Sequence, residues 1–533
     1  MQLKKHLPFV LACVVLVLSL PVWSILTSWL WVDASAWQIL KEMAQHLLPE
    51  YTLNTFYLAF GVLLGSTMLG VASALCVSIF EFKARQWWEW ALLLPMAMPA
   101  YVLAYAYTDF FQFSGAFQNF FRNTFELEGR LIPEIRSLPG AIVVLSLCLY
   151  PYIYLLTRSA LLQRSHHLLD AAKLLGLSVS GQIVKVILPL ARPSIAVGIT
   201  LVLMETLADY GVTSYFGVAT FSTGIYKAWL VMDDKLAAAQ LASFLLVFIL
   251  VVVILEKQAQ QQLRFVGKGQ RLGTQAPRIQ LALKGQIIAS LICALPLLLA
   301  FILPVAILIA SIYSTTLELV WTNFIHWTIN SIQLAATGAL LIVSWVLILA
   351  YLQRVQSSKT LNVAVQVLNL GYAVPGAVLV VGLLMPIMTW QTYYPNLKLG
   401  YWITGTSLGI LWIYFIRFSS VALQSVQGAY QGVPVSLDES AQLLGVKGWA
   451  IFKKIHWPLL RPSVLAASLL VFVDVMKELP ATLVLRPFNS DTLAVAAYQL
   501  ARDERLAEAA VPSLVLVLVG LIPVLLLSKS DQR

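Results

Sequence analysis

The sequence predicts an all-α integral membrane protein of about twelve transmembrane helices, built as two repeats. Charged residues make up only 11% of the 533 residues, against roughly 25% in soluble domains. Hydrophobic residues make up 59%, and long apolar runs recur along the chain. Runs of about 20 apolar residues cross the hydrocarbon core of a bilayer. This composition excludes an ordinary soluble protein.

The apolar runs place the spans in order along the chain. Lys4 and Lys5 precede the first run as they would in a signal peptide. No small-residue cleavage site with a soluble domain follows, so we expect the first span to be retained. The twelve predicted spans are 8–30, 54–80, 88–112, 139–161, 194–216, 236–255, 286–312, 330–352, 362–388, 403–424, 463–485 and 511–527.

The distribution of Lys and Arg between loops predicts the orientation. Basic residues are in excess at the N-terminus, after the second span (Lys83 and Arg85) and in segment 256–285. All three fall on one side of a twelve-span chain, which the positive-inside rule makes the cytoplasm. Both termini are then cytoplasmic. The net charge of +10 therefore reflects topology and does not indicate nucleic-acid binding.

Cysteine and histidine give no sign of a resident metal site. The four cysteines are isolated within spans and form no CxxC pair, and the histidines are scattered. We expect the cysteines to act as small hydrophobic residues.

Internal similarity divides the chain into two copies of one unit. Asp170 aligns with Glu439 and Pro193 with Pro462, at one offset (439 − 170 = 269). "NTFYLA" from Asn54 matches "NSIQLA" farther along the chain. We expect a first repeat at 1–255, a cytoplasmic basic linker at 256–285 and a second repeat at 286–533. Six spans separate equivalent points, so both repeats have the same orientation in the membrane.

The most polar repeated stretch is "LLDAAKLLG" in loop 165–193 and "SLDESAQLLG" in loop 434–462. An acid stands near a helix start, where the helix dipole favours it. A glycine follows where a left-handed residue can end the helix. The pattern predicts a short helix, a turn and a second short helix running toward a proline, beside the membrane. An amphipathic helix that only anchors the loop at the interface would look the same.

This pattern resembles the EAA loop of ABC-importer permeases: an acid, two small residues, three positions, glycine, then a helix ending in proline. The copies depart from it at Asp170, in place of Glu, and at Ser440, in place of Ala. The resemblance implies that 168–178 and 437–447 are coupling helices that dock into two ATPase subunits. The coupling residues it implies are Asp170, Ala171, Ala172, Gly176, Glu439, Ser440, Ala441 and Gly445.

The chain has no phosphate-binding GxxxxGK[ST] motif. We therefore expect it to catalyse no chemistry and to bind no cofactor itself. ATP and magnesium would act in the separate ATPase subunits.

Carboxylates inside spans are rare and usually face a cavity or a partner. Glu205 with Asp209, and Asp474 with Glu478, are spaced i, i+4 and would share a helical face. Glu205 and Asp474 each stand 11 residues past the start of their span (205 − 194 and 474 − 463). The four acids would therefore lie near the midplane as a negative path for a cation. Capping of broken helices, or pairing of Asp474 with Lys477, is the structural alternative.

The stretch "YVLAYAYTDF" after Pro99 adds Tyr105 and Asp109. Phenol and carboxylate oxygens suit hard cations. An aromatic belt at the outer interface is the alternative for the tyrosines.

Several longer stretches, among them "ETLADYGVTSYFGVATFSTGIYKAW" and "KELPATLVLRPF", resemble the fused permeases of bacterial ferric-iron importers. The resemblance implies a MetI-like type I fold in the bacterial inner membrane. It also implies a periplasmic binding protein and Fe³⁺ as the transported ion, held transiently by Glu205, Asp209, Asp474 and Glu478. Related permeases carry thiamine, aminophosphonates or polyamines, and an ion-coupled secondary transporter is the alternative from another class.

Overall fold

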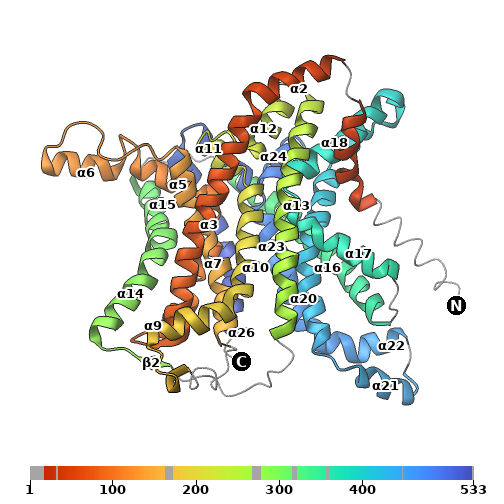
Figure 1. The fold of residues 1–533 in the computed structure, drawn as a ribbon. Coiled ribbons are helices and arrows are strands. Elements are labelled where there is room, and N and C mark those ends of the chain that lie inside the picture. The colour runs from red at the N-terminus through yellow and green to blue at the C-terminus, as the bar shows by residue number, and fades with distance from the viewer. Residues whose placement is uncertain are drawn as a thin grey trace. The chain divides into compact units, whose positions relative to one another are not determined.

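The computed structural model describes residues 17–31, 34–162, 172–266, 278–314, 321–355, 359–446 and 448–530, and almost all of them are helical (Figure 1). Within this part of the chain, ten helices are long and apolar enough to cross a membrane. The pair Arg85–Ala97 and Ala100–Phe125, bent by 89°, is an eleventh candidate, and Val17–Leu30 is a shorter apolar helix. The prediction of an all-α membrane protein is thus confirmed. The expected twelve spans are reached only if the bent pair and the short helix also cross.

The chain forms two compact units whose segments alternate along the sequence. The first unit contains 1–40, 225–243 and 319–496. The second contains 41–224, 244–318 and 497–533. Each unit therefore has a core from one sequence repeat and receives helices from the other half of the chain.

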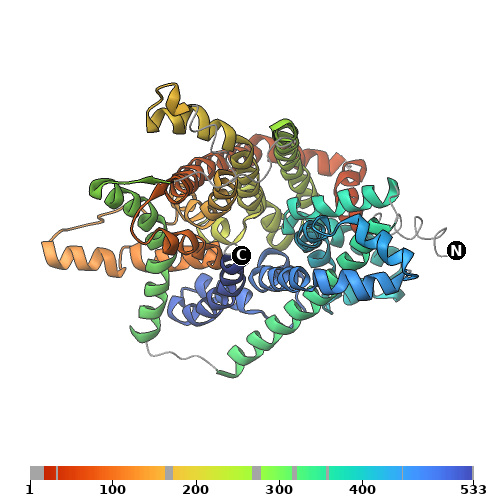
Figure 2. The same ribbon diagram turned by 90° about the horizontal axis from the view of Figure 1, so that it is seen from below.

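Three helices form the core of the second unit: α3 (Leu48–Ile79), α7 (Leu138–Leu162) and α10 (Leu188–Ala208). They run side by side in both views (Figures 1 and 2). Small residues allow this approach, as they commonly do between membrane helices. A Cβ atom on Gly70 of α3 would lie 2.8 Å from the carbonyl oxygen of Tyr150 in α7.

The core of the first unit repeats this arrangement with α16 (Trp321–Val355), α20 (Leu408–Gln431) and α23 (Trp457–Lys477). The repeated asparagines show the correspondence. The Asn54 side chain donates to the carbonyl of Ala219 at 3.0 Å. The Asn330 side chain donates to the carbonyl of Asp491 at 3.2 Å. Each ties the start of a core helix to a later segment of its own unit.

Shorter elements complete each unit. Those of the second unit are β1 (Phe80–Glu81), α4 (Arg85–Ala91), η2 (Leu94–Ala97), α5 (Ala100–Phe111), α6 (Ala116–Phe125), α9 (Val179–Gln182), η3 (Ile183–Ile187), α11 (Gly211–Tyr215), α12 (Phe221–Tyr226), β2 (Ile279–Gln280), α14 (Leu283–Leu297), η6 (Leu298–Ile302), α15 (Leu303–Ser314) and α26 (Leu506–Ser530), α12 ending just inside the first unit. Those of the first unit are η1 (Ser28–Trp31), η4 (Lys227–Val231), α17 (Lys359–Leu370), η7 (Gly371–Ala373), α18 (Gly376–Tyr393), η8 (Pro395–Leu397), α19 (Leu399–Thr404), α21 (Val435–Leu443), α22 (Trp449–Ile451), η9 (Phe452–His456) and α24 (Pro480–Leu485). The boundaries between the units fall within α2 (Ala34–His46), α25 (Leu493–Arg502) and the long helix α13 (Lys235–Val266).

Two details add to the sequence-based expectation. β1 and β2 form a two-residue parallel bridge beside the helices. The segment expected as a linker from residue 256 begins as helix, because α13 continues to Val266. The bridge holds the far end of that segment against the loop after α3.

Candidate functional site

The second repeated loop carries the sharp turn that its glycine predicts. α21 ends in a turn where Gly445 has φ 82°. The Val446 N–H donates to the carbonyl of Ala441 at 2.9 Å, and the Gly445 N–H donates to that of Gln442 at 3.0 Å. These two bonds form a Schellman motif, which a left-handed glycine permits.

The first loop closes in the same way. Gly176 has φ 75°. The Leu177 N–H donates to the carbonyl of Ala172 at 3.1 Å, and the Gly176 N–H donates to that of Lys173 at 2.9 Å. The predicted conformation of both glycines is confirmed. Asp170 and Ala171 lie outside the described residues.

Burial separates the two sides of each loop. Ala172 and its counterpart Ala441 are buried, whereas Glu439 and Ser440 are exposed. A leucine pair before each glycine points into open space: the exposed fractions are 90% and 82% for Leu174 and Leu175, and 89% and 83% for Leu443 and Leu444. Sequence reasoning missed these leucines, although the repeated "LLG" could have identified them. Two nearly bare leucines on each loop are typical of a docking surface.

Replacing Gly445 by alanine is expected to destabilise the turn by about 1 kcal/mol, because an L-residue is strained in the left-handed region. An added Cβ would meet no atom within 4 Å, so backbone strain alone is tested. Thermal unfolding of the purified protein measures the change. Gly428→Ala in helix α20 is the matched control, since its Cβ also meets nothing and alanine is favoured there. Equal effects of both substitutions would contradict the prediction.

The second helix of each loop corrects the expectation of a short helix beside the membrane. It continues through the prolines into the next span, as one helix over Val179–Ala208 and another over Trp449–Lys477. A π-helical turn precedes the proline in each, η3 and η9. Such turns absorb local irregularity inside α-helices. Each loop is therefore joined rigidly to a core helix.

Charged side chains far apart in the sequence seat α21 on its unit. The Arg354 Nε donates to Asp438 Oδ2 at 2.8 Å, and Arg354 also donates to the carbonyl of Val433 at 2.9 Å. The buried His456 ring bonds Asp438 Oδ1 through Nε2 at 2.8 Å. The Tyr430 hydroxyl lies 3.4 Å from His456 Nδ1. No sequence signal predicts this cluster, because Arg354 and Asp438 are 84 residues apart.

The Asp438 cluster predicts an acid-sensitive attachment of α21. Burial raises the pKa of the Asp438 carboxyl, but the hydrogen bonds from His456 and Arg354 outweigh it, so the pKa lies below its ordinary value of 3.8. A depressed pKa stabilises the folded state above that ordinary value, and the stabilisation is lost as the pH falls below it. Asp438→Asn should loosen α21 at pH 7 by about 1.5–3 kcal/mol, the range for hydrogen bonds to charged groups. Hydrogen exchange of the α21 amides measures this, and the difference from wild type should shrink below pH 4; a constant difference would refute it.

The structure changes the interpretation of the four intramembrane acids. α10 ends at Ala208 and α23 ends at Lys477, so Asp209 and Glu478 follow their helices in extended conformation. The prediction that each pair shares one helical face is wrong. Glu205 lies near the C-terminal end of a 30-residue helix, not in the middle of a shorter one. Gly211 and Pro480, two residues after the acids, were the sequence signals for these breaks.

Asp209 and Glu478 act at equivalent places in their own units. Asp209 Oδ1 accepts a hydrogen bond from the Thr213 N–H of α11 at 3.1 Å. Glu478 accepts bonds from the N–H groups of Ala481 and Thr482, both at 2.9 Å. Both acids thus cap the short helix that follows, which is the structural alternative stated for them. Asp474 remains on α23, half-buried.

Tyr105 and Asp109 lie on α5 in the second unit, with Glu205 and Asp209. The Tyr105 side chain is buried, and its ring packs against Tyr215 of α11, the short helix that Asp209 caps. Asp109 Oδ2 instead accepts a hydrogen bond from the Ser311 hydroxyl of α15 at 2.9 Å. The structure therefore places Tyr105 and Asp209 at the same short helix and ties Asp109 to α15.

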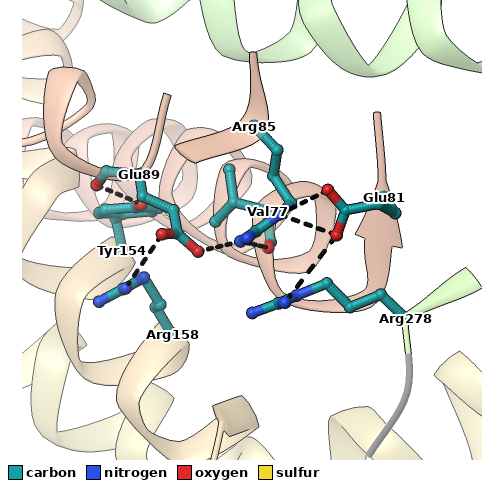
Figure 3. A network of polar contacts seen from close by, with 7 residues as sticks. All are labelled: Val77, Glu81, Arg85, Glu89, Tyr154, Arg158 and Arg278. Atoms are coloured by element: carbon teal, nitrogen blue, oxygen red, sulfur yellow. Dashed lines mark hydrogen bonds and ion pairs between the residues drawn. The ribbon is translucent and has the colours of Figure 1, made fainter. Parts of the chain in front are cut away.

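A polar network fastens the β-bridge at the end of α3 (Figure 3). Arg85 is buried between Glu81 and Glu89, with its Nε 3.1 Å from Glu81 Oε2. Arg278 lies 3.9 Å from Glu81, and Arg158 lies 3.7 Å from Glu89. The charge of Arg85 is thus compensated inside the fold and adds little to the basic excess of its loop.

Comparison with known proteins identifies the family. The model of the binding-protein-dependent transport system inner membrane component matches residues 66–265 and 347–533. The chain is 27% identical to the Fe(3+)-transport system permease protein FbpB 2 of Haemophilus influenzae, over 99% of each chain. A 2-aminoethylphosphonate permease, PhnU of Salmonella choleraesuis, is 25% identical over 36% of this chain and 68% of its own length. The maltose permease MalG of Vibrio parahaemolyticus is 28% identical over 32% of this chain and 57% of its own. Two family matches in one chain, at the two sequence repeats, show that this protein belongs to the inner membrane components of binding-protein-dependent ABC transport systems, as a multi-pass permease with two fused permease domains.

Proposed function

We propose that this permease imports ferric iron. The observation that carries the proposal is the match to an iron permease over 99% of both chains, whereas the matches to the phosphonate and maltose permeases cover about a third of this chain. Carboxylate and phenol oxygens in the spans suit a hard cation. They would serve an anionic phosphonate poorly.

In this proposal two copies of an ATPase bind the two repeated loops, and a periplasmic binding protein delivers Fe³⁺. Both termini are cytoplasmic. The chain holds no cofactor; ATP and magnesium act in the ATPase subunits. Closure of the ATPases would move the loops, and each loop would move the core helix continuous with it. The loop residues are those predicted above, joined by the leucine pairs. Glu205, Asp209 and Asp474, with Tyr105 and Asp109, supply the path.

Uptake of ⁵⁵Fe³⁺ tests this proposal in cells that carry the permease, its ATPase and its binding protein. Wild type should accumulate iron, and Gly176→Trp with Gly445→Trp should abolish uptake by blocking the loops. Uptake of labelled thiamine, polyamine or 2-aminoethylphosphonate by cells that take up no iron would assign a different substrate. Iron uptake without the ATPase would instead indicate an ion-coupled secondary transporter.

A further inference from the structure

The acids that cap α11 and α24 stand at equivalent positions in the two repeats and share a backbone role. In each, a threonine four residues later returns a hydrogen bond to the carbonyl of the acid: Thr213 to Asp209 at 3.1 Å, and Thr482 to Glu478 at 2.9 Å. The capping role therefore cannot by itself explain any difference between the two acids.

The two acids differ in whether a nearby cation compensates their negative charge. Glu478 is 5% exposed, and Arg417 of α20 lies 3.3 Å from its Oε1. Gly376 closes the same site, because a Cβ there would lie 3.2 Å from Glu478 Oε1 and 3.3 Å from Arg417 Nη1. The negative charge of Glu478 is thus neutralised and enclosed. A buried ion pair of this kind holds a fold in one arrangement.

Asp209 has no comparable partner in the described part of its unit. No Lys, Arg or His nitrogen lies within 4.0 Å of its carboxylate among the described ion pairs. At the 269-residue offset, Arg417 corresponds to Cys148, which is neutral. The nearby acid Glu205 adds negative charge to the site. An acid without a counter-ion inside a membrane protein is expensive, and this points to a function.

Asp209 and Tyr105 meet the same short helix, α11. Asp209 Oδ1 accepts the Thr213 N–H, and the Tyr105 ring packs against Tyr215, the last residue of α11, at a centroid distance of 4.7 Å. Tyr105 also packs against Tyr101, at 5.7 Å. Tyr498 lies 6.0 Å from the Tyr210 ring and shares a 2.8 Å hydrogen bond with Ser214. Phenol and carboxylate oxygens thus gather at α11, and Arg136 binds only the outermost of them, donating to the Tyr215 hydroxyl at 3.2 Å.

The Tyr105 hydroxyl is the exceptional member of the cluster. Tyr105 is 2% exposed, and its hydroxyl has no hydrogen-bond partner among the described residues. A buried hydroxyl without a partner costs free energy, and a ligand that arrives beside it would remove this cost. Tyr107, on the same helix, differs: its hydroxyl has a hydrogen-bond partner, because it donates to the carbonyl of Leu299.

We propose that Asp209 and Tyr105 form a hard-cation site in the first repeat, whereas Glu478 is a structural acid neutralised by Arg417. This proposal rests on the proposed function, and it gives the two equivalent acids different roles. A hard trivalent ion would be bound by the Asp209 carboxylate and the Tyr105 phenol oxygen. The two repeats then differ at these equivalent positions: the first holds the cation site and the second holds the ion pair.

Terbium(III) binding tests the site without transport. Terbium is a hard trivalent ion whose luminescence is excited through nearby tyrosine, and it would be added to the purified complex with its ATPase. Tyr105→Phe and Asp209→Asn should each weaken terbium binding about 10- to 100-fold, the usual loss when a group in a metal site is removed. Tyr107→Phe is the matched control and should bind as wild type does. Glu478→Gln combined with Arg417→Met should keep the terbium signal, since both charges of the enclosed pair are removed together.

Iron-uptake measurements distinguish a failure of the cation site from a failure of the proposed iron transport. If wild type imports iron, Tyr105→Phe should lower the uptake while binding-protein-stimulated ATP hydrolysis continues. Unchanged terbium binding in Tyr105→Phe and Asp209→Asn would overturn the site, even where iron is imported. If wild type imports no iron but terbium binding depends on both residues, the proposed substrate is wrong and the cation site stands.

Discussion

Replacing both Leu443 and Leu444 by serine is expected to abolish ATP-driven import while the permease stays folded in the membrane. Each side chain is almost fully exposed, so serine removes no packing within the chain. Burial of a leucine in a partner groove contributes about 1.5–3 kcal/mol. Losing two such anchors should weaken binding of the ATPase by more than about 100-fold.

Co-purification of the ATPase with the permease measures this effect, together with uptake in cells. Leu174→Ser with Leu175→Ser should act in the same way, since the first loop presents the same pair. Gln442→Ser is the matched control, because Gln442 is also exposed on α21 but polar. If the leucine variants retained full ATPase binding, docking would not depend on these side chains. If they failed to reach the membrane, the leucines would have a role in folding.

The second large effect, on the stability of the folded protein, is expected at the buried ion pair of Arg417 and Glu478. Arg417→Met should destabilise the protein by about 3–5 kcal/mol, because it leaves the Glu478 charge buried without its partner. Adding Glu478→Gln should restore much of this stability, since an uncharged pair needs no compensation. The recovery is incomplete, because Ala481 and Thr482 donate to different oxygens of Glu478 and a glutamine amide has a single acceptor oxygen.

Thermal unfolding of the purified protein and its amount in the membrane measure both variants. The prediction requires a large difference between the single and the double substitution. Equal losses in the two would show that Arg417 stabilises the fold through contacts other than the Glu478 charge. Arg486→Met is a useful comparison, because its partner Asp491 is more exposed. It should cost only about 1 kcal/mol or less, as partly exposed pairs do.

Much of this architecture is local and was therefore predictable from the sequence. Hydropathy identified the spans because a membrane helix satisfies its own backbone and needs only an apolar surface of sufficient length. The constant offset identified two equivalent cores. The glycine turns of both loops followed from one backbone requirement, a left-handed residue at the helix end. The sequence therefore determined the class of protein, its duplication and the position of its two repeated loops.

The tertiary structure decided which polar groups meet. Periodicity placed Asp209 and Glu478 on helical faces, but α10 and α23 end just before these acids, and new short helices begin at Gly211 and Pro480. The pairing of Arg417 with Glu478 and the seating of Asp438 by Arg354 join residues 61 and 84 positions apart. Such pairings depend on how helices pack, which no local pattern encodes. For the same reason, two acids that the sequence presents as equivalents differ in the fold. Glu478 is enclosed with an arginine, whereas Asp209 caps the helix on which Tyr105 packs, and the Tyr105 hydroxyl has no hydrogen-bond partner in the described part of the chain.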